Sequence, residues 1–157
     1  MRISEIMTDN VRVVRPEQTI QEAARIMAQI DAGSLPVTND GRLVGIITDR
    51  DIVVRAVRLA LGPSTPVQDV MSENVTHCFS DDDVEAVAQK MAQLQVRRLP
   101  VLDRQERLLG IVALGDIATG IIPGPAGLAL SGISERGGTH NQTEETVHEG
   151  DASSLER

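Results

Sequence analysis

The stretch that decides the fold is Gly45-Ile46-Ile47-Thr48-Asp49-Arg50-Asp51. Its isoleucines follow Val44 and are β-branched, which predicts a short strand that is buried on both faces. Thr48 or Asp49 can cap the helix that follows, and Asp51 falls in the first helical turn. A first-turn side chain points back toward the strand, so we expect the Asp51 carboxylate about one turn from the Thr48 hydroxyl. Such a corner suits a sugar diol, because an ionised carboxylate only accepts hydrogen bonds and can take both ribose hydroxyl protons.

Composition limits the classes of function. The chain has 157 residues, enough for one compact domain or for two small halves that share a core. It contains one Phe and no Trp or Tyr, so the core must be aliphatic and any bound base must be gripped by aliphatic side chains. A net charge of −8 also argues against nucleic-acid binding, which rewards basic patches and stacking. We therefore expect no DNA partner.

The sequence does not resemble that of a membrane or secreted protein. No run reaches the roughly 18 apolar residues that a spanning helix needs. The N-terminal residues Met1 to Glu5 do not form the apolar core of a signal peptide. A single cysteine excludes an internal disulfide framework. We expect a cytoplasmic protein without a membrane partner.

The first half of the chain predicts a β-α-β-β-α unit. Thr19 and Glu22 form a capping box at the start of a helix that Gly33 ends, and Pro66 is expected at the first position of a later helix. The second helix of the unit is expected to turn Ile52, Val53, Ala56, Val57 and Leu61 inward. The predicted elements are a helical turn at 4–7, strands at 11–14, 35–37 and 43–47, and helices at 20–30 and 49–61.

The chain then repeats itself. Leu35-Pro36-Val37 recurs as Leu99-Pro100-Val101 at an offset of 64, and Leu43-Val44-Gly45-Ile46 recurs as Leu108-Leu109-Gly110-Ile111 at an offset of 65. The extra residue falls in a turn, as expected for an internal duplication. We therefore predict an α+β fold of two repeats, residues 1–64 and 65–122, that pack sheet to sheet about a pseudo-twofold axis.

The repeat pattern stops after Ile122. Residues 1–122 contain 13 Lys and Arg against 17 Asp and Glu, and residues 123–157 contain 2 against 6, so each part has a net charge of −4. The last part has no apolar periodicity and is rich in Gly, Ser, Thr and Glu. We predict that residues 123–157 form a flexible acidic tail that is mostly disordered.

These repeats resemble a tandem pair of CBS domains, the cystathionine-β-synthase-type regulatory repeats. The resemblance covers about residues 1–120. It rests on the Ile-Met-Thr and Val-Met-Ser openings at 6–8 and 70–72, the two Leu-Pro-Val strands, and the two Gly-Ile-(Ile/Val)-x-x-x-Asp closings. It implies a stand-alone sensor that binds an adenosine-containing ligand between the repeats and associates as a dimer. AMP, ATP and NAD are the expected ligands, S-adenosylmethionine is ranked behind them, and no cofactor is required.

The resemblance also implies roles for individual residues. Thr48 and Asp51 match the family's ribose-binding motif. Asp116 keeps the carboxylate of that motif, but Ala113 replaces the hydroxyl, so the second site is predicted to be weaker or empty. Arg97 and Arg98 precede the second Leu-Pro-Val, at a position that faces the phosphate of the ligand held by the other repeat. The adenine is expected to contact Met7, Thr8, Val11, Val13, Gly33, Ser34 and Pro36.

Each assignment has a simpler alternative. Asp51 alone would be a first-turn acid that the helix dipole stabilises, and Arg97 with Arg98 could be a solvated helix end. Cys78 aligns with a strand position and is expected to be a buried, inert thiol, whereas His77 could contact a second base or simply be a core or surface side chain. We find no metal-ligand spacing and no set of nucleophile, base and orienting group.

Two other functions remain as alternatives to a nucleotide sensor that acts through an unknown effector protein or its own dimer. The first is a ligand-free module for protein interaction or dimerisation. The second is a small enzyme, such as a nucleotide hydrolase, which would need a positioned base and usually a metal cluster.

Overall fold

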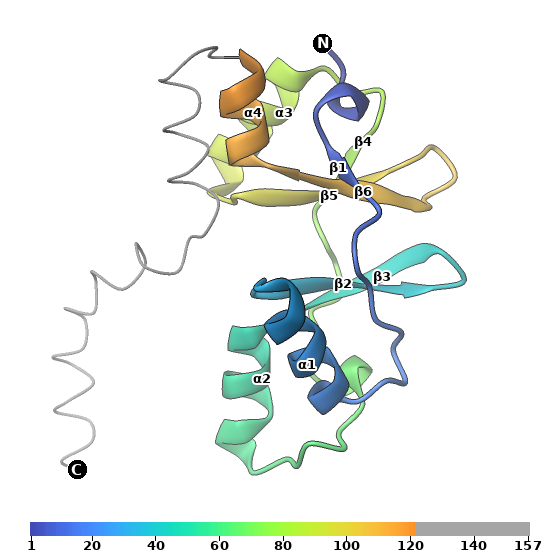
Figure 1. Cartoon of the computed structure of the whole chain (residues 1–157), viewed down its shortest axis with the longest axis vertical. Helices are drawn as coiled ribbons and strands as arrows, with labels where there is room; N and C mark the ends of the chain where they lie inside the picture. Colours follow the sequence, from blue (N-terminus) through green and yellow to red (C-terminus); the bar gives the residue numbers. More distant parts are fainter. Residues whose placement is uncertain (122–157) are drawn as a thin grey trace, which may run out of the picture. The chain divides into compact units, whose positions relative to one another are not determined.

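The computed structural model describes residues 1–121, so the predicted acidic tail lies outside the described residues (Figure 1). The chain has two compact units: the first is Met1–Val112, and the second begins at Ala113 and is described through α4. The elements in chain order are η1 (Ile3–Glu5), β1 (Thr8–Asp9), α1 (Ile20–Ile30), β2 (Ser34–Asn39), β3 (Arg42–Thr48), α2 (Asp49–Arg55), η2 (Val57–Leu59), η3 (Val67–Asp69), β4 (Cys78–Phe79), α3 (Val84–Leu94), β5 (Arg98–Leu102), β6 (Leu108–Ala113) and α4 (Leu114–Ile121), where η marks a single 3-10 turn.

Helix α1 begins at the predicted capping box. The Glu22 amide donates to Thr19 Oγ1 at 3.1 Å, and the Thr19 amide donates to Glu22 Oε1 at 3.0 Å. The helix ends at Ile30, as predicted, but Asp31 ends it instead of Gly33: Asp31 adopts the left-handed conformation with φ 56° and its amide bonds back to the Met27 carbonyl. An Asp tolerates this conformation better than most residues, so Gly33 is not needed to end the helix.

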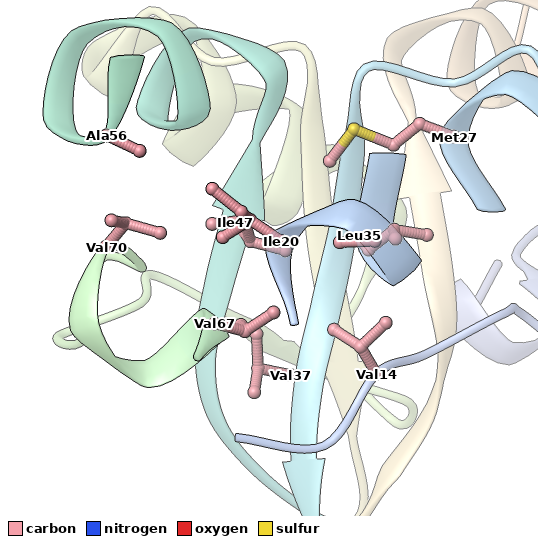
Figure 2. Close-up of a cluster of buried hydrophobic side chains, with 10 residues drawn as sticks. Val14, Ile20, Met27, Leu35, Val37, Ile47, Ala56, Val67 and Val70 are labelled. Carbon is pink, nitrogen blue, oxygen red and sulfur yellow. The ribbon is translucent and has the colours of Figure 1, made fainter. Parts of the chain in front are cut away.

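Strands β2 and β3 form an antiparallel hairpin in which Ser34 pairs with Thr48 and Pro36 with Ile46. Side chains alternate between the two faces of a strand, and one face of this hairpin packs against α1 and α2. Figure 2 shows the aliphatic cluster on that side. Burying each of its large side chains contributes about 1.5–3 kcal/mol to folding. The buried members are Val14, Ile20, Ala23, Met27, Leu35, Val37, Ile47, Ala56, Val67 and Val70.

The sheet of each repeat is completed by the opening segment of the other repeat. Thr8 of β1 pairs with Ile111 of β6, which belongs to repeat 2. Ser72, which is equivalent to Thr8 at the offset of 64, pairs with Ile46 of repeat 1 through two hydrogen bonds of 2.9 Å. The two repeats therefore exchange their opening segments: β1 joins the sheet of repeat 2, and Ser72 forms a bridge to the hairpin of repeat 1.

The duplication is also visible in the parallel pairings. Val14 forms a parallel bridge with Val37, and the equivalent residues Cys78 and Val101 pair in the parallel strands β4 and β5. The four-stranded sheet has the order β1-β6-β5-β4. The mixed α+β fold with two β-α-β-β-α repeats agrees with the prediction.

Two buried glycines make the exchange of strands possible. A Cβ on Gly45 would lie 2.8 Å from the Ser72 carbonyl oxygen and 2.7 Å from Met71 Sδ. A Cβ on Gly110, the equivalent residue, would collide with the Thr8 carbonyl oxygen. Only glycine lets the exchanged backbone approach so closely, which explains why the two repeats share the Gly-Ile pair.

Three details of the predicted elements are wrong. Residues 11–14 do not form a strand beyond the bridge at Val14, and a strand that was not predicted lies earlier, at Thr8–Asp9. The second helix does not reach residue 61: α2 ends at Arg55 and the single turn η2 follows. Pro66 precedes η3 with an extended conformation instead of occupying the first helical position.

The inward face of α2 is also narrower than predicted. Ala56 is fully buried and Ile52 packs against the core, but Val53, Val57 and Leu61 are 58%, 63% and 42% exposed. Val53 lies one residue beyond Ile52, so it falls about 100° around the helix from the buried stripe, and Val57 and Leu61 lie beyond the end of α2. Only one stripe of this short helix can face the hairpin.

Candidate functional site

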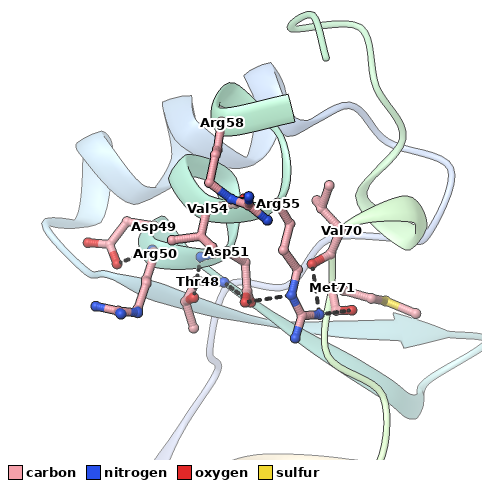
Figure 3. Close-up of polar contacts among 9 residues, drawn as sticks. All are labelled: Thr48, Asp49, Arg50, Asp51, Val54, Arg55, Arg58, Val70 and Met71. Carbon is pink, nitrogen blue, oxygen red and sulfur yellow. Dashed lines mark hydrogen bonds and ion pairs between the residues drawn. The ribbon is translucent and has the colours of Figure 1, made fainter. Parts of the chain in front are cut away.

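The corner between β3 and α2 is built as a capping box. The Asp51 amide donates to Thr48 Oγ1 at 2.9 Å, and the Thr48 amide donates to Asp51 Oδ2 at 3.0 Å (Figure 3). Thr48, and not Asp49, is therefore the residue that caps the helix. Asp51 therefore has a structural role at the start of α2. Its capacity to bind a ligand as well depends on its second carboxylate oxygen.

That oxygen, Asp51 Oδ1, accepts no hydrogen bond from any described residue. Its nearest cation is Arg55, whose Nε lies 3.9 Å away. The Asp51 side chain is 13% exposed, so the carboxylate is shielded but can still be reached. An ionised carboxylate has capacity for about four hydrogen bonds, and the corner therefore retains acceptors for hydroxyl donors after the helix has been capped.

Two further predicted residues lie at this corner. Ser34 pairs with Thr48 at the open end of the hairpin, and the Asp49 amide donates to the Gly33 carbonyl at 2.9 Å. A Cβ on Gly33 would lie 2.9 Å from Asp49 Oδ2, so the loop passes close to the start of α2. The structure thus brings together four residues that the sequence assigned to the site: Gly33, Ser34, Thr48 and Asp51.

Val11 and Val13 line a pocket of about 270 Å³ near the turn of the same hairpin. The lining does not include Thr48 or Asp51, because the turn and the corner lie at opposite ends of β3. Pro36 lies between them on β2, where its carbonyl accepts a hydrogen bond of 3.1 Å from the Val14 amide. The residues that line the pocket are Asn10, Val11, Val13, Thr38, Gly41, Leu108 and Leu109.

Met7 and Thr8 do not pair with the sheet that contains Thr48. Thr8 pairs with Ile111 on the sheet of repeat 2. The residues next to the corner are instead Met71 and Ser72, since Ser72 pairs with Ile46, two residues before Thr48. The sequence did contain a signal for these residues, namely the offset of 64 between the two openings, but the exchange of strands between repeats cannot be read from one sequence.

The remaining predicted residues belong to repeat 2. Arg98 begins β5 and is exposed, and Arg97 precedes it and is half-buried; both side chains have interaction partners. Asp116 lies in the second unit, where its Oδ2 accepts a hydrogen bond of 2.8 Å from the Ala113 amide. This is half of a capping box, because Ala113 has no hydroxyl that could accept a hydrogen bond from the Asp116 amide. The predicted phosphate role of the arginines stays a prediction.

A two-point ion pair lies in repeat 2, between Asp81 and Arg104. Arg104 donates to both Asp81 carboxylate oxygens, at 2.7 and 3.2 Å, and its guanidinium stacks 4.1 Å from the centre of the Phe79 ring. These hydrogen bonds lower the pKa of Asp81 and raise the pKa of Arg104. Burial raises the pKa of the Cys78 thiol to about 11, so the thiol is buried and protonated, as predicted.

The described residues offer no metal centre and no membrane span. Within residues 1–121, no group of three or more His, Cys, Asp or Glu side chains is placed to hold a metal ion. No helix in the same range is long and apolar enough to cross a membrane. His77 directs Nδ1 toward the Val75 carbonyl at 3.2 Å and meets the edge of the Phe79 ring.

The fold and the two strand-to-helix corners define a duplicated α+β module. The CBS domain family matches residues 3–58 and 67–122, and the chain belongs to this family. It is 44% identical over 135 residues to the CBS domain-containing protein YhcV of Bacillus subtilis, with 85% of this chain and 96% of that protein covered.

Two solved structures show the same fold. One is Hypoxic Response Protein I with two coordinated zinc ions, with a TM-score of 0.70, 32% identity, and coverage of 77% of this chain and 99% of that one. The other is the CBS domain pair of protein MJ0100 in complex with 5-methylthioadenosine and S-adenosyl-L-methionine, with a TM-score of 0.64, 30% identity, and coverage of 75% and 93%.

Proposed function

We propose that this protein is a non-enzymatic sensor that binds an adenosine-containing nucleotide. The observation that carries the proposal is the Thr48–Asp51 corner, where Asp51 Oδ1 remains an acceptor after the capping box has formed. Both hydroxyls of a ribose can donate to such a carboxylate. The MJ0100 domain pair, which shares this fold, was solved with two adenosine-containing ligands, and this supports the ligand class.

The base and the phosphate of the nucleotide can also be assigned to neighbouring residues. A base that leaves the ribose along β2 would lie against Pro36, whereas the pocket lined by Val11 and Val13 is at the other end of β3. Aliphatic walls suit this chain, which has only one aromatic ring from Phe, Trp or Tyr. The phosphate would be held by Arg97 or Arg98, because guanidinium groups form paired, charge-assisted bonds with phosphate oxygens.

Signalling would follow from linkage. The hairpin that carries Thr48 is bridged at Ile46 by Ser72 of repeat 2, so a ligand at the Thr48–Asp51 corner contacts a structure to which both halves contribute. A ligand that binds one arrangement of the repeats more tightly shifts the population toward it. At 100 times its dissociation constant, such a ligand stabilises the bound state by about 2.7 kcal/mol.

The partner that recognises that arrangement is proposed to be a second copy of the chain or an effector protein. Apolar side chains line α2 and η2 on the solvent side, and we call Val53, Val57 and Leu59 the α2–η2 patch; they are 58%, 63% and 54% exposed. Exposed apolar side chains grouped along one segment are typical of interaction surfaces. The same patch favours the alternative function, a ligand-free dimerisation module.

Calorimetry and thermal shift distinguish the two functions. The full chain is titrated with AMP, ATP, NADH and S-adenosylmethionine, and we expect at least one of them to bind and raise the melting temperature. Asp51→Asn should raise the dissociation constant about tenfold or more, because it removes a charged acceptor. Absence of binding by all four compounds would support the ligand-free module instead.

The chain contains a matched control for this variant. Glu22→Gln changes the acid of the Thr19–Glu22 capping box, which serves α1 as the Thr48–Asp51 box serves α2. Both variants weaken a cap, but only Asp51→Asn should weaken nucleotide binding. Equal affinities for the two variants would show that Asp51 is structural only.

A further inference from the structure

Arg55 connects the corner at Asp51 to the opening segment of repeat 2. Its Nε lies 3.9 Å from Asp51 Oδ1, and its Nη1 donates to the Met71 carbonyl at 3.1 Å and to the Val70 carbonyl at 3.5 Å. Figure 3 shows the guanidinium between the carboxylate and the two carbonyls. One planar side chain therefore contacts both the predicted ribose acceptor and a segment from the other half of the chain.

The position of Arg55 on α2 explains how it reaches both groups. Residues four apart lie on the same side of a helix, and an acid that precedes a base at this spacing is in the favourable order. Asp51 and Arg55 have this spacing. The guanidinium can then extend past the carboxylate to the end of η3, where Val70 and Met71 lead into Ser72.

The segment that Arg55 holds is the one that pairs beside the corner. Ser72 exchanges two hydrogen bonds of 2.9 Å with Ile46, and Ile46 lies two residues before Thr48. A change at Asp51 can therefore reach the strand pairing between repeats through one side chain. A lysine could not replace this contact, since its single ammonium group lacks the fork that meets partners on two sides.

We propose that Arg55 is a positioning residue that couples nucleotide occupancy at Asp51 to the pairing of residues 67–72 with β3. The inference rests on the proposed function. When ribose hydroxyls donate to Oδ1, the carboxylate is fixed, the guanidinium beside it is fixed in turn, and the Val70 and Met71 carbonyls lose freedom. The bridge between Ser72 and Ile46 then opens less often.

Hydrogen exchange of the full chain, with and without saturating AMP or ATP, tests the coupling. In the wild type, nucleotide should slow exchange at residues 48–51 and also at residues 67–72. Arg55→Gln should raise the dissociation constant by about twofold to fivefold. At nucleotide concentrations raised to saturate this variant, protection at 48–51 should return, whereas the added protection at 67–72 should be lost.

Two other variants sharpen the result. Arg58→Gln is the matched control, because the Arg58 Nε donates to the Val54 carbonyl of its own helix at 3.0 Å (Figure 3) and should behave as the wild type does. Arg55→Lys keeps the charge but not the fork, so it should bind nucleotide almost normally and still lose protection at 67–72. Full protection in that variant would overturn the two-sided contact.

The possible failures are distinguishable. If none of AMP, ATP, NADH and S-adenosylmethionine binds the wild type, the proposed function and the coupling fail together. If nucleotide binds and Arg55→Gln gains the same protection at 67–72 as the wild type, only the coupling is wrong.

Discussion

Arg42 and Arg107 form an antiparallel bridge, although 65 positions separate them. The same number is the offset between the two copies of the Leu-x-Gly-Ile motif, so each arginine contacts its own equivalent in the other repeat. A residue that meets its equivalent must lie on the axis that relates the copies. The pseudo-twofold axis therefore passes between the turns of the two hairpins, where the Leu108 amide also donates to the Gly41 carbonyl at 3.0 Å.

The exchange of strands across this axis predicts a strong effect of Gly45→Ala. The new Cβ would meet the Ser72 carbonyl, a backbone atom that cannot move without loss of its pairing with Ile46. We expect the free energy of unfolding to fall by about 1–3 kcal/mol, measured by urea denaturation. Gly62→Ala is the control, because a Cβ there would have no atom within 4 Å. Equal stability of the two variants would contradict the close approach.

The α2–η2 patch predicts the oligomeric state. Val53→Asp combined with Val57→Asp places charges on side chains that are already exposed, so the fold of one chain should be preserved. If the patch holds a second copy, light scattering should show a dimer for the wild type and a monomer for the variant. Leu94→Asp changes an apolar side chain that is 46% exposed at the end of α3, and it should leave the dimer intact. A wild type that is monomeric at all concentrations would exclude this role of the patch.

The Asp81–Arg104 pair predicts that its contribution to the free energy of unfolding depends on pH in the acidic range. Arg104 lowers the pKa of Asp81 below its ordinary value of 3.8, so the contribution of the pair is fully present above that pH. It is lost as the pH falls through the lowered pKa of the folded state. The difference in unfolding free energy between the wild type and Asp81→Asn should stay constant from about pH 7 to pH 5 and shrink below about pH 4.

The control for this prediction is an acid without a partner. Asp40→Asn removes the same charge at the turn between β2 and β3, where the Asp40 side chain makes no ion pair or hydrogen bond with any described residue. A pH profile for Asp81→Asn that matches the profile of Asp40→Asn would show that the ion pair with Arg104 contributes nothing specific.

The sequence predicted what depends on local spacing. The capping box at Thr19, a helix cap at Thr48 or Asp49 and the hairpin of repeat 1 follow from neighbouring residues, and the duplication identified the fold; the bond from the Thr48 amide to Asp51 was not predicted. Strand β1 was not predicted, because its partner, Ile111, belongs to the other repeat and a pattern within one segment does not encode that pairing. For the same reason Arg55 was overlooked: its contact with the Met71 carbonyl joins segments from different repeats.

The incomplete capping box of repeat 2 leads to the last prediction. Asp116 already accepts a hydrogen bond from the Ala113 amide, and only the returning hydroxyl is missing. Ala113→Thr would restore the arrangement seen at Thr48 and Asp51, and threonine suits the end of a strand such as β6. The new cap should raise the free energy of unfolding by about 1 kcal/mol, measured by urea denaturation.

The same substitution tests whether the hydroxyl limits the second ligand site. If the loss of the hydroxyl is what weakens that site, calorimetry with AMP or ATP should show the stoichiometry rise from one nucleotide per chain toward two. Ala113→Val is the control, because it adds a β-branched side chain of similar size without the hydroxyl. A gain of stability with an unchanged stoichiometry would show that the cap was restored but that other residues keep the second site from binding.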